Sequence, residues 1–137
     1  MSKINDSMEI CEHHYNTIQN FINYFIILNN ISINHSHKYY FSENQITLYL
    51  KNNTITNIHY YNESNKLEKI ISLGIDKINY NNNFWYYHII NNYKILIVLS
   101  GFCFINSLKY IVVSNIMVII NNNEYKIIDH CLFILRD

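Results

Sequence analysis

The stretch that decides the fold is the last third of the chain, residues 94–137, which reads KILIVLSGFCFINSLKYIVVSNIMVIINNNEYKIIDHCLFILRD. Apolar runs fill it, and short Asn-containing breaks separate them at residues 106–107 and 121–124. Breaks of this length and composition are typical of β-hairpins. The stretch therefore predicts a meander of consecutive strands over residues 94–105, 109–120 and 125–135.

Apolar residues occupy both faces of these predicted strands. Residues 95–99 read Ile-Leu-Ile-Val-Leu without a polar interruption, and residues 116–120 and 131–135 behave in the same way. A sheet with one face in water would instead alternate apolar and polar side chains. We therefore expect the chain's own helices to cover one face and a partner protein to cover the other.

The first part of the chain carries a helical pattern. Apolar residues recur every three or four positions and predict a long amphipathic helix over residues 7–29, with Ser7 as its N-cap. Residues 32–40 predict a second, short helix. The side chains that we expect to face inward from it are Ile33, His37 and Tyr40.

The middle of the chain predicts a hairpin, a helix and a further strand. Alternation at residues 46–50 and 54–58 indicates two strands joined by a turn at residues 51–53. Asn62 or Ser64 can cap a third helix, which ends at Gly74. Its buried stripe would comprise Leu67, Ile70 and Ile71. Residues 75–80 are ambiguous, whereas residues 84–90 indicate a strand and Asn91 with Asn92 the turn that follows it.

This order predicts an α+β fold, in which two or three helices pack on one face of a bent antiparallel sheet. At 137 residues we expect a single domain spanning residues 1–137. A formal net charge of zero, with 15% charged residues, gives no long-range attraction to nucleic acid or to anionic lipid. We see no secretory signal and no apolar run near the roughly 20 residues of a membrane-spanning helix. We therefore expect a soluble, intracellular protein.

The three cysteines, Cys11, Cys103 and Cys131, are odd in number, widely spaced and set among apolar residues. This pattern favours buried, reduced thiols over a disulfide or a metal role.

Several segments of the chain carry a family pattern. Residues 21–25 (FINYF) lie in the long helix, residues 95–101 (ILIVLSG) form an apolar strand that ends in Gly, and residues 114–118 (SNIMV) lie in the next strand. The terminal segment YKIIDHCLFILRD is similar to an aromatic-x-Ile-x-x-Asp-x-Phe-Arg-Phe strand. Together they resemble the cone-shaped nuclear transport factor 2-like superfamily, most closely the small subunit of the nuclear mRNA export receptor heterodimer.

The resemblance implies a non-catalytic dimerisation subunit without cofactor or metal. Its sheet face would pair with a homologous domain of the receptor's large subunit, and the pair would bind Phe-Gly nucleoporins in the nucleus, at the nuclear pore and in the cytoplasm. The alignment places these residues at the partner interface: Val98, Ser100, Phe102, Val113, Asn115, Met117, Cys131, Phe133 and Leu135. The residues expected to face into the cone are Ile128, His130, Leu132 and Ile134. A register error of one residue would exchange the two sets.

Two departures from the family pattern bear on function. Phe133 stands where the family often has an Arg for an ion pair between subunits. The homodimeric carrier of Ran-GDP uses a Trp-Glu pair at the end of its first strand, where this chain has Leu50 and Lys51. It also uses two Asp residues in a later turn, where this chain has Ile105, Asn106 and Ser107. The resemblance therefore favours export over Ran import, which stays the alternative.

Two further alternatives remain open at the level of sequence. The same cone houses dehydratases and isomerases that use a His and an Asp, for which His130, His37, His88 and Asp76 are the candidates. The aromatic run at residues 84–87, with Tyr80 and Tyr93, offers stacking surfaces for single-stranded RNA. Few basic residues accompany this run, so core and interface positions are the preferred interpretation.

Overall fold

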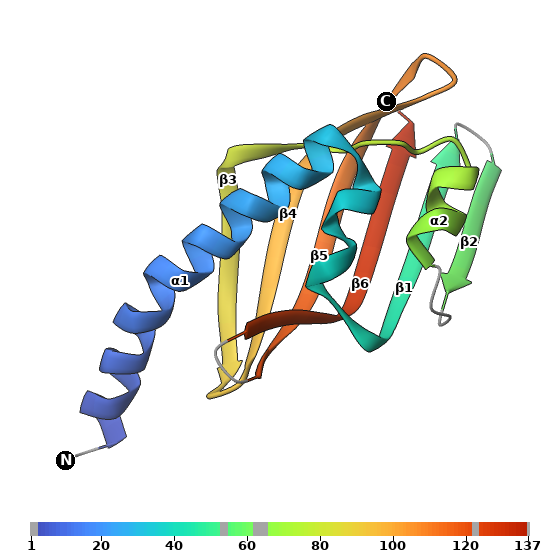
Figure 1. The fold of residues 1–137 in the computed structure, drawn as a ribbon. Coiled ribbons are helices and arrows are strands. Elements are labelled where there is room, and N and C mark those ends of the chain that lie inside the picture. The colour runs from blue at the N-terminus through green and yellow to red at the C-terminus, as the bar shows by residue number, and fades with distance from the viewer. Residues whose placement is uncertain (1–2, 53–54, 62–65, 122–123, 137) are drawn as a thin grey trace.

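The computed structural model describes residues 3–52, 55–61, 66–121 and 124–136 (Figure 1). Side chains are described for residues 15–40, 44–51, 58, 67–120 and 124–136. The elements are α1 (Lys3–Ile31), the 3₁₀ helix η1 (Ile33–Tyr39), β1 (Tyr40–Asn52), β2 (Ile55–Tyr61), α2 (Lys66–Ser72), β3 (Asn79–Asn91), β4 (Lys94–Ile105), β5 (Leu108–Asn121) and β6 (Glu124–Arg136). Among the described helices, none is both long and apolar enough to cross a membrane.

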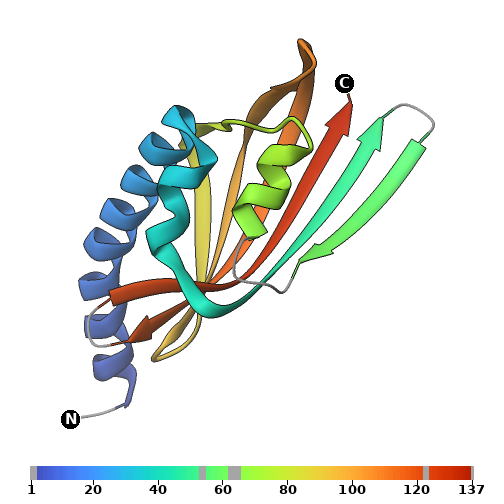
Figure 2. The same cartoon turned by 45° about the vertical axis from the view of Figure 1, so that its right-hand side comes forward.

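The six strands form one sheet in the order β2-β1-β6-β5-β4-β3. The predicted meander is present as β4, β5 and β6, which pair antiparallel. β1 pairs with β6 in parallel, so the sheet is mixed. The prediction of a wholly antiparallel sheet is wrong at this pair of strands. α1, η1 and α2 all lie on the same side of this bent sheet, as Figures 1 and 2 show. The predicted α+β layout is therefore confirmed.

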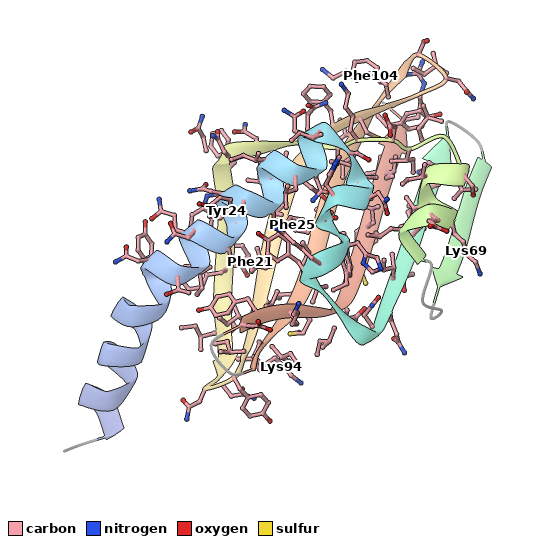
Figure 3. The ribbon with its side chains drawn as sticks, in the orientation of Figure 1. Phe21, Tyr24, Phe25, Lys69, Lys94 and Phe104 are labelled. Carbon is pink, nitrogen blue, oxygen red and sulfur yellow. The ribbon has the colours of Figure 1, made fainter. Side chains whose placement is uncertain are left out.

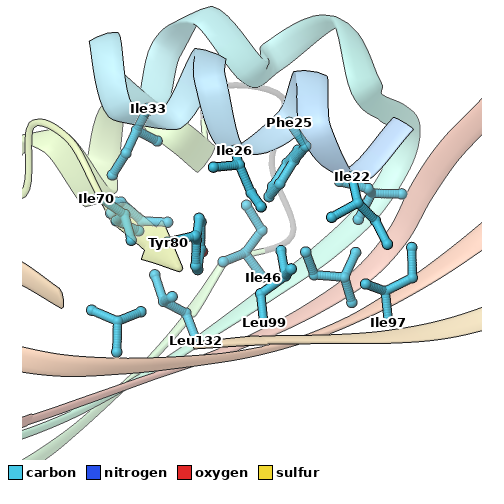
Figure 4. Packing of buried hydrophobic residues seen from close by; sticks show 14 of the residues in the cluster. Ile22, Phe25, Ile26, Ile33, Ile46, Ile70, Tyr80, Ile97, Leu99 and Leu132 are labelled. Carbon is cyan, nitrogen blue, oxygen red and sulfur yellow. The ribbon is translucent and has the colours of Figure 1, made fainter. Parts of the chain in front are cut away.

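The core lies between the helices and one face of the sheet. Ile18, Ile22 and Phe25 of α1 are completely buried. Figure 4 shows Ile22 and Phe25 above strand residues such as Ile97 and Leu99. Burying side chains of this size contributes about 1.5–3 kcal/mol each relative to leaving them exposed. The helices are therefore held on the sheet mainly by apolar contact.

The helix boundaries and periods differ from the prediction at two places. α1 begins at Lys3, so Ser7 lies inside the helix and is not its N-cap. η1 is a 3₁₀ helix, in which every third residue shares a face. Ile33 and Ser36 are accordingly buried, whereas His37 is exposed and does not face inward as predicted. The error came from assuming the α-helical period.

The central elements are longer than predicted. Lys51 and Asn52 belong to β1 and not to a turn, and β2 extends to Tyr61. The proposed caps Asn62 and Ser64 lie outside the described residues. In α2 and the turn after it the prediction holds, because Leu67 and Ile70 are buried, Ile71 packs against the core, and Gly74 has a φ of +100°.

A β-bulge in β6 corrects another prediction. Met117 pairs with Asp129, but the next residue, Val118, pairs with Ile127, so Ile128 has no direct partner on β5. The bulge shifts the alternation of side chains by one residue. Ile127 is buried inside the cone and Ile128 is half-buried, contrary to the expectation that Ile128 faces inward.

Gly101 allows β3 and β4 to approach closely. A Cβ atom built at this position would lie 2.6 Å from the Cα of Tyr80 and would overlap the backbone oxygen of Asn79. Both of these atoms belong to the backbone, so no side-chain rotation relieves the clash. The pairing of Tyr80 with Gly101 therefore requires glycine.

We predict that Gly101→Ala lowers the free energy of unfolding by about 1–3 kcal/mol, because the added methyl group pushes β3 away from β4. Urea unfolding followed by circular dichroism measures the change. Ser100→Ala is the matched control, since Ser100 is half-exposed on the same strand. Equal stability of Gly101→Ala and the unmodified protein would contradict the close approach.

Candidate functional site

The sheet has one face that no described element covers, which we call the open face. All of the predicted interface residues lie on it, each half-buried: Val98, Ser100, Phe102, Val113, Asn115, Met117, Cys131, Phe133 and Leu135. Their neighbours along the strands, such as Val112, Ser114 and Leu132, are buried on the helix side. The structure thus places these residues together. Whether a partner contacts them stays a prediction.

One apolar row crosses the open face. The strand register places Ser100 beside Val113 and Val113 beside Phe133. Phe133 pairs with Tyr49, whose ring centroid lies 5.8 Å away, and Tyr49 pairs with Ile58 at the edge of the sheet. Ile58 is 66% exposed. The row therefore spans β4, β5, β6, β1 and β2, with Ser100 at its polar end.

Neighbouring rows widen this surface. Phe102 lies beside Ile111, and Ile111 beside Leu135. On the other side of the central row, Val98 pairs with Asn115 and Asn115 with Cys131. The open face is thus mostly apolar, with a few uncharged polar side chains near its middle and charged residues toward its ends, among them Asp129 beside Met117 and Lys51 beside Leu135. Such a surface is typical of a protein interface.

The sequence analysis missed several residues of the open face: Tyr49, Ile58, Ile111 and Tyr86. The alternation of Ile46 and Leu48 with Thr47 and Tyr49 carried the signal for Tyr49, because the inward positions are the aliphatic ones. Tyr86 follows from its pairing with Val98. Neither could be assigned to the same face as Phe133 without knowing which strands are neighbours.

The aromatic run at residues 84–87 divides between two surroundings. Trp85 and Tyr87 pack against the core, and their ring centroids lie 6.1 Å apart. Phe84 is 70% exposed and Tyr86 is 58% exposed. The run therefore presents two rings to solvent from the edge strand β3.

The two described cysteines are unpaired thiols in different surroundings. Cys103 is buried on the helix side, and burial raises the pKa of its thiol to about 12. Cys131 is half-buried on the open face, where desolvation and then the charge of Asp129 raise the pKa of its thiol. Both thiols therefore stay protonated at neutral pH, and neither has the lowered pKa of a reactive cysteine. The side chain of Cys11 lies outside the described residues.

A chain of hydrogen bonds runs through the interior of the cone. The Nδ1 atom of His130 lies 2.8 Å from the hydroxyl oxygen of Tyr40, and its Nε2 atom lies 3.0 Å from the Oγ atom of Ser114. The hydroxyl oxygen of Tyr80 lies 2.6 Å from the same Oγ atom. These hydrogen bonds satisfy buried polar groups of β1, β3, β5 and β6. Burying the same groups without partners would cost free energy.

Burial sets the protonation states of these hydrogen-bonded side chains. It lowers the pKa of His130 from 6.5 to about 3, so the imidazole is neutral at pH 7. Burial also raises the pKa of Tyr40 well above its usual value, and the negative charge that Tyr80 would carry if ionised adds to this, while a hydrogen bond with Ser36 opposes it. Burial likewise raises the pKa of Tyr80, partly offset by its bond to Ser114. The four hydrogen-bonded side chains are therefore uncharged at neutral pH.

The catalytic alternative finds little geometric support. His130 points into the cone as expected, but its proposed companions His37, His88 and Asp76 are all exposed and do not lie with it. Ser114 beside His130 has the separation expected of a nucleophile and its base. Ser114 is nevertheless 0% exposed, so a substrate has no access to its hydroxyl. We therefore assign the buried hydrogen bonds to structure.

We predict an acid-dependent loss of stability that originates at His130. The unfolded chain protonates this residue below pH 6.5, whereas the folded protein keeps it neutral down to about pH 3. The contribution is complete above pH 6.5 and falls by about 1.4 kcal/mol per pH unit below it, which gives roughly 2 kcal/mol between pH 7 and pH 5.

Urea unfolding of the unmodified protein and of His130→Gln over this pH range measures the effect. The variant is less stable at pH 7 but should show a flatter pH dependence. His88→Gln, an exposed histidine, is the control and should follow the unmodified protein. Parallel curves for the unmodified protein and His130→Gln would contradict the prediction.

Comparison with known proteins gives one relative in sequence and a clear likeness in structure. No protein-family model matches the chain. The uncharacterized protein L295 of Acanthamoeba polyphaga mimivirus is 31% identical over 99 residues, which make up 69% of this chain and 50% of L295. The chain therefore spans about half the length of this curated relative.

The structural likeness is to yeast Bre5, described as a Ubp3-associated protein. The crystal structure of Bre5 matches with a TM-score of 0.62 at 12% identity, over 86% of this chain and 93% of that chain. Bre5 in the complex of the yeast deubiquitinase Ubp3 with its Bre5 cofactor matches with a TM-score of 0.62 at 11% identity, over 90% and 97% of the two chains. At this identity the likeness establishes the fold. The chain has the nuclear transport factor 2-like fold.

Proposed function

We propose that this protein is a non-catalytic dimerisation subunit that pairs with another polypeptide through its open face. The observation that carries the proposal is the apolar row from Val113 through Phe133 and Tyr49 to Ile58, on a face that no described element covers. Large exposed apolar surfaces mark interaction sites. An obligate interface of this kind would bury on the order of 2,000 Å² or more in total.

The partner that we propose is a homologous domain in the large subunit of a nuclear mRNA export receptor. The terminal strand β6 carries the resemblance to the small subunit of that receptor, and three of its side chains lie on the open face: Cys131, Phe133 and Leu135. Phe133 in place of Arg suits an apolar interface, since a buried ion pair is replaceable by apolar contact without loss of stability. This role would place the protein in the nucleus, at the nuclear pore and in the cytoplasm.

A surface pocket supports the proposed contact with Phe-Gly nucleoporins. The pocket has a volume of about 320 Å³ and lies between α1, η1 and the start of β6. Phe21, Tyr39 and Tyr125 line it, with centroid distances of 5.0 Å between Phe21 and Tyr39 and 5.7 Å between Phe21 and Tyr125. Aromatic rings favour tilted and edge-to-face contacts at these distances, and a Phe side chain of a nucleoporin would pack against them in the same way. The pocket is remote from the open face, so both contacts are compatible.

The import alternative is disfavoured by charge. Lys51 is exposed at the end of β1, where the Ran-GDP carrier has a carboxylate, and the β4–β5 turn consists of Asn106 and Ser107, which carry no charge. A basic partner surface would meet a lysine here and no acid. Bre5, whose fold this chain shares, is a cofactor in a complex with an enzyme. That precedent supports a role as a binding subunit.

We predict that Val113→Glu, at the centre of the open face, disrupts association and weakens it at least tenfold, since an unpaired buried carboxylate costs several kcal/mol. Light scattering after size exclusion measures the molar mass of the purified chain and of the chain co-expressed with the receptor's large subunit.

The matched control is Tyr24→Glu, because Tyr24 is an exposed aromatic residue on the helix layer (Figure 3). It should leave association unchanged. An unaltered mass for Val113→Glu would reject the open face as the interface. Association of the chain only with Ran-GDP, and not with the large subunit, would favour the import alternative.

We also predict that a synthetic peptide with two Phe-Gly repeats shifts the amide resonances of residues around Tyr39 and Tyr125, and that Tyr39→Ala abolishes these shifts by removing one wall of the pocket. Two-dimensional NMR measures them. Tyr93→Ala, an exposed ring in the β3–β4 turn, is the control. Shifts that persist in Tyr39→Ala, or that map to another surface, would remove the support that this pocket gives.

A further inference from the structure

A wide bulge in the edge strand β3 creates a recess at one end of the open face. Tyr80 pairs with Gly101 and Trp85 pairs with Leu99, so residues 81–84 of β3 lie opposite Ser100 alone. Bulges of edge strands occur preferentially beside functional sites, where they redirect side chains and interrupt pairing. Here the bulge interrupts the pairing of β3 with β4 opposite Ser100.

The recess forms a pocket of about 520 Å³, which we call the bulge pocket. Its lining combines amide, hydroxyl, aromatic and aliphatic groups with one cation, from Asn79, Asn81, Ser100, Phe102, Lys109 and Ile111. This volume lies within the range of about 300–1,000 Å³ that is typical of ligand pockets. A side chain as large as Trp would therefore fit.

Lys109 is the charged residue among those that line the bulge pocket. The Nζ atom of Lys109 lies 4.7 Å from the ring centroid of Phe102, and the lining residues include no carboxylate. Its ammonium group is held by this cation–π contact. A carboxylate on an incoming group would complement it.

We propose that the bulge pocket binds an apolar side chain of a partner polypeptide that has an acidic residue next to it. The apolar side chain would contact Phe102 and Ile111, while the carboxylate would pair with Lys109. Asn79 and Asn81 would supply hydrogen bonds to the peptide backbone. The bulge pocket shares Ser100 and Phe102 with the open face, so this inference rests on the proposed function: the polypeptide that covers the open face would supply the inserted side chain.

The test uses three probe peptides that differ in one residue: acetyl-Ser-Trp-Glu-Ser-amide and its Gln and Lys analogues. Chemical-shift titration of the isotope-labelled chain maps the site and gives the affinities. We expect saturable shifts around Ser100, Phe102 and Lys109, and at least about a tenfold preference for the Glu peptide over the Lys peptide. Lys109→Glu should reverse this preference.

The controls separate this site from other effects. Lys94 lies at the opposite end of β4 from Phe104 (Figure 3), so Lys94→Glu should leave the preference unchanged. Ser100→Trp should fill the pocket and abolish binding. Phe133→Glu, on β6 and outside the pocket lining, should keep peptide binding even if it abolishes dimerisation, which distinguishes the two proposals. Shifts that map outside the pocket, the absence of saturable binding, or an unchanged preference in Lys109→Glu would overturn the inference.

Discussion

The helices bury only one face of the sheet, and the rest of the structure depends on this constraint. Every described helix lies on the same side, and the inward residues of β4, β5 and β6 are buried beneath them. The outward residues of the same strands, such as Val113 and Phe133, are nearly as apolar but remain half-exposed. All of the described helices cover the same face, so none of them covers the other. The function proposed here follows from that imbalance.

The interior of the cone is filled by buried polar groups that satisfy one another. Tyr40, His130, Ser114 and Tyr80 are linked by hydrogen bonds, and their burial keeps them uncharged at neutral pH. These groups join four strands and satisfy one another, so none is left free to act on a substrate. Three surfaces outside the cone carry the proposed contacts with other polypeptides: the open face, the aromatic pocket at Phe21 and the bulge pocket.

Much of this architecture could be predicted from local sequence. The bounds of β4 agree with the prediction, and the family resemblance assigned Val98, Val113 and Cys131 to one face correctly, because side chains of a strand point alternately to its two faces. The errors at His37 and Ile128 arose where a 3₁₀ period and a bulge shift that alternation. The parallel pairing of β1 with β6 and the wide bulge of β3 involve contacts between distant segments, so no local pattern indicates them.

The central claim is that a second polypeptide seals the open face, and the reactivity of Cys131 tests it most directly. This thiol is half-buried near the middle of that face, whereas Cys103 is completely buried inside the cone. Alkylation with a maleimide at several protein concentrations, followed by peptide mass spectrometry, measures the modification rate of each cysteine separately. We predict that Cys131 is modified faster than Cys103 in dilute protein, although its raised pKa slows the reaction, and that its modification slows further in concentrated or partner-bound protein. A modification rate of Cys131 that changes neither with protein concentration nor with the partner present would contradict a sealed open face.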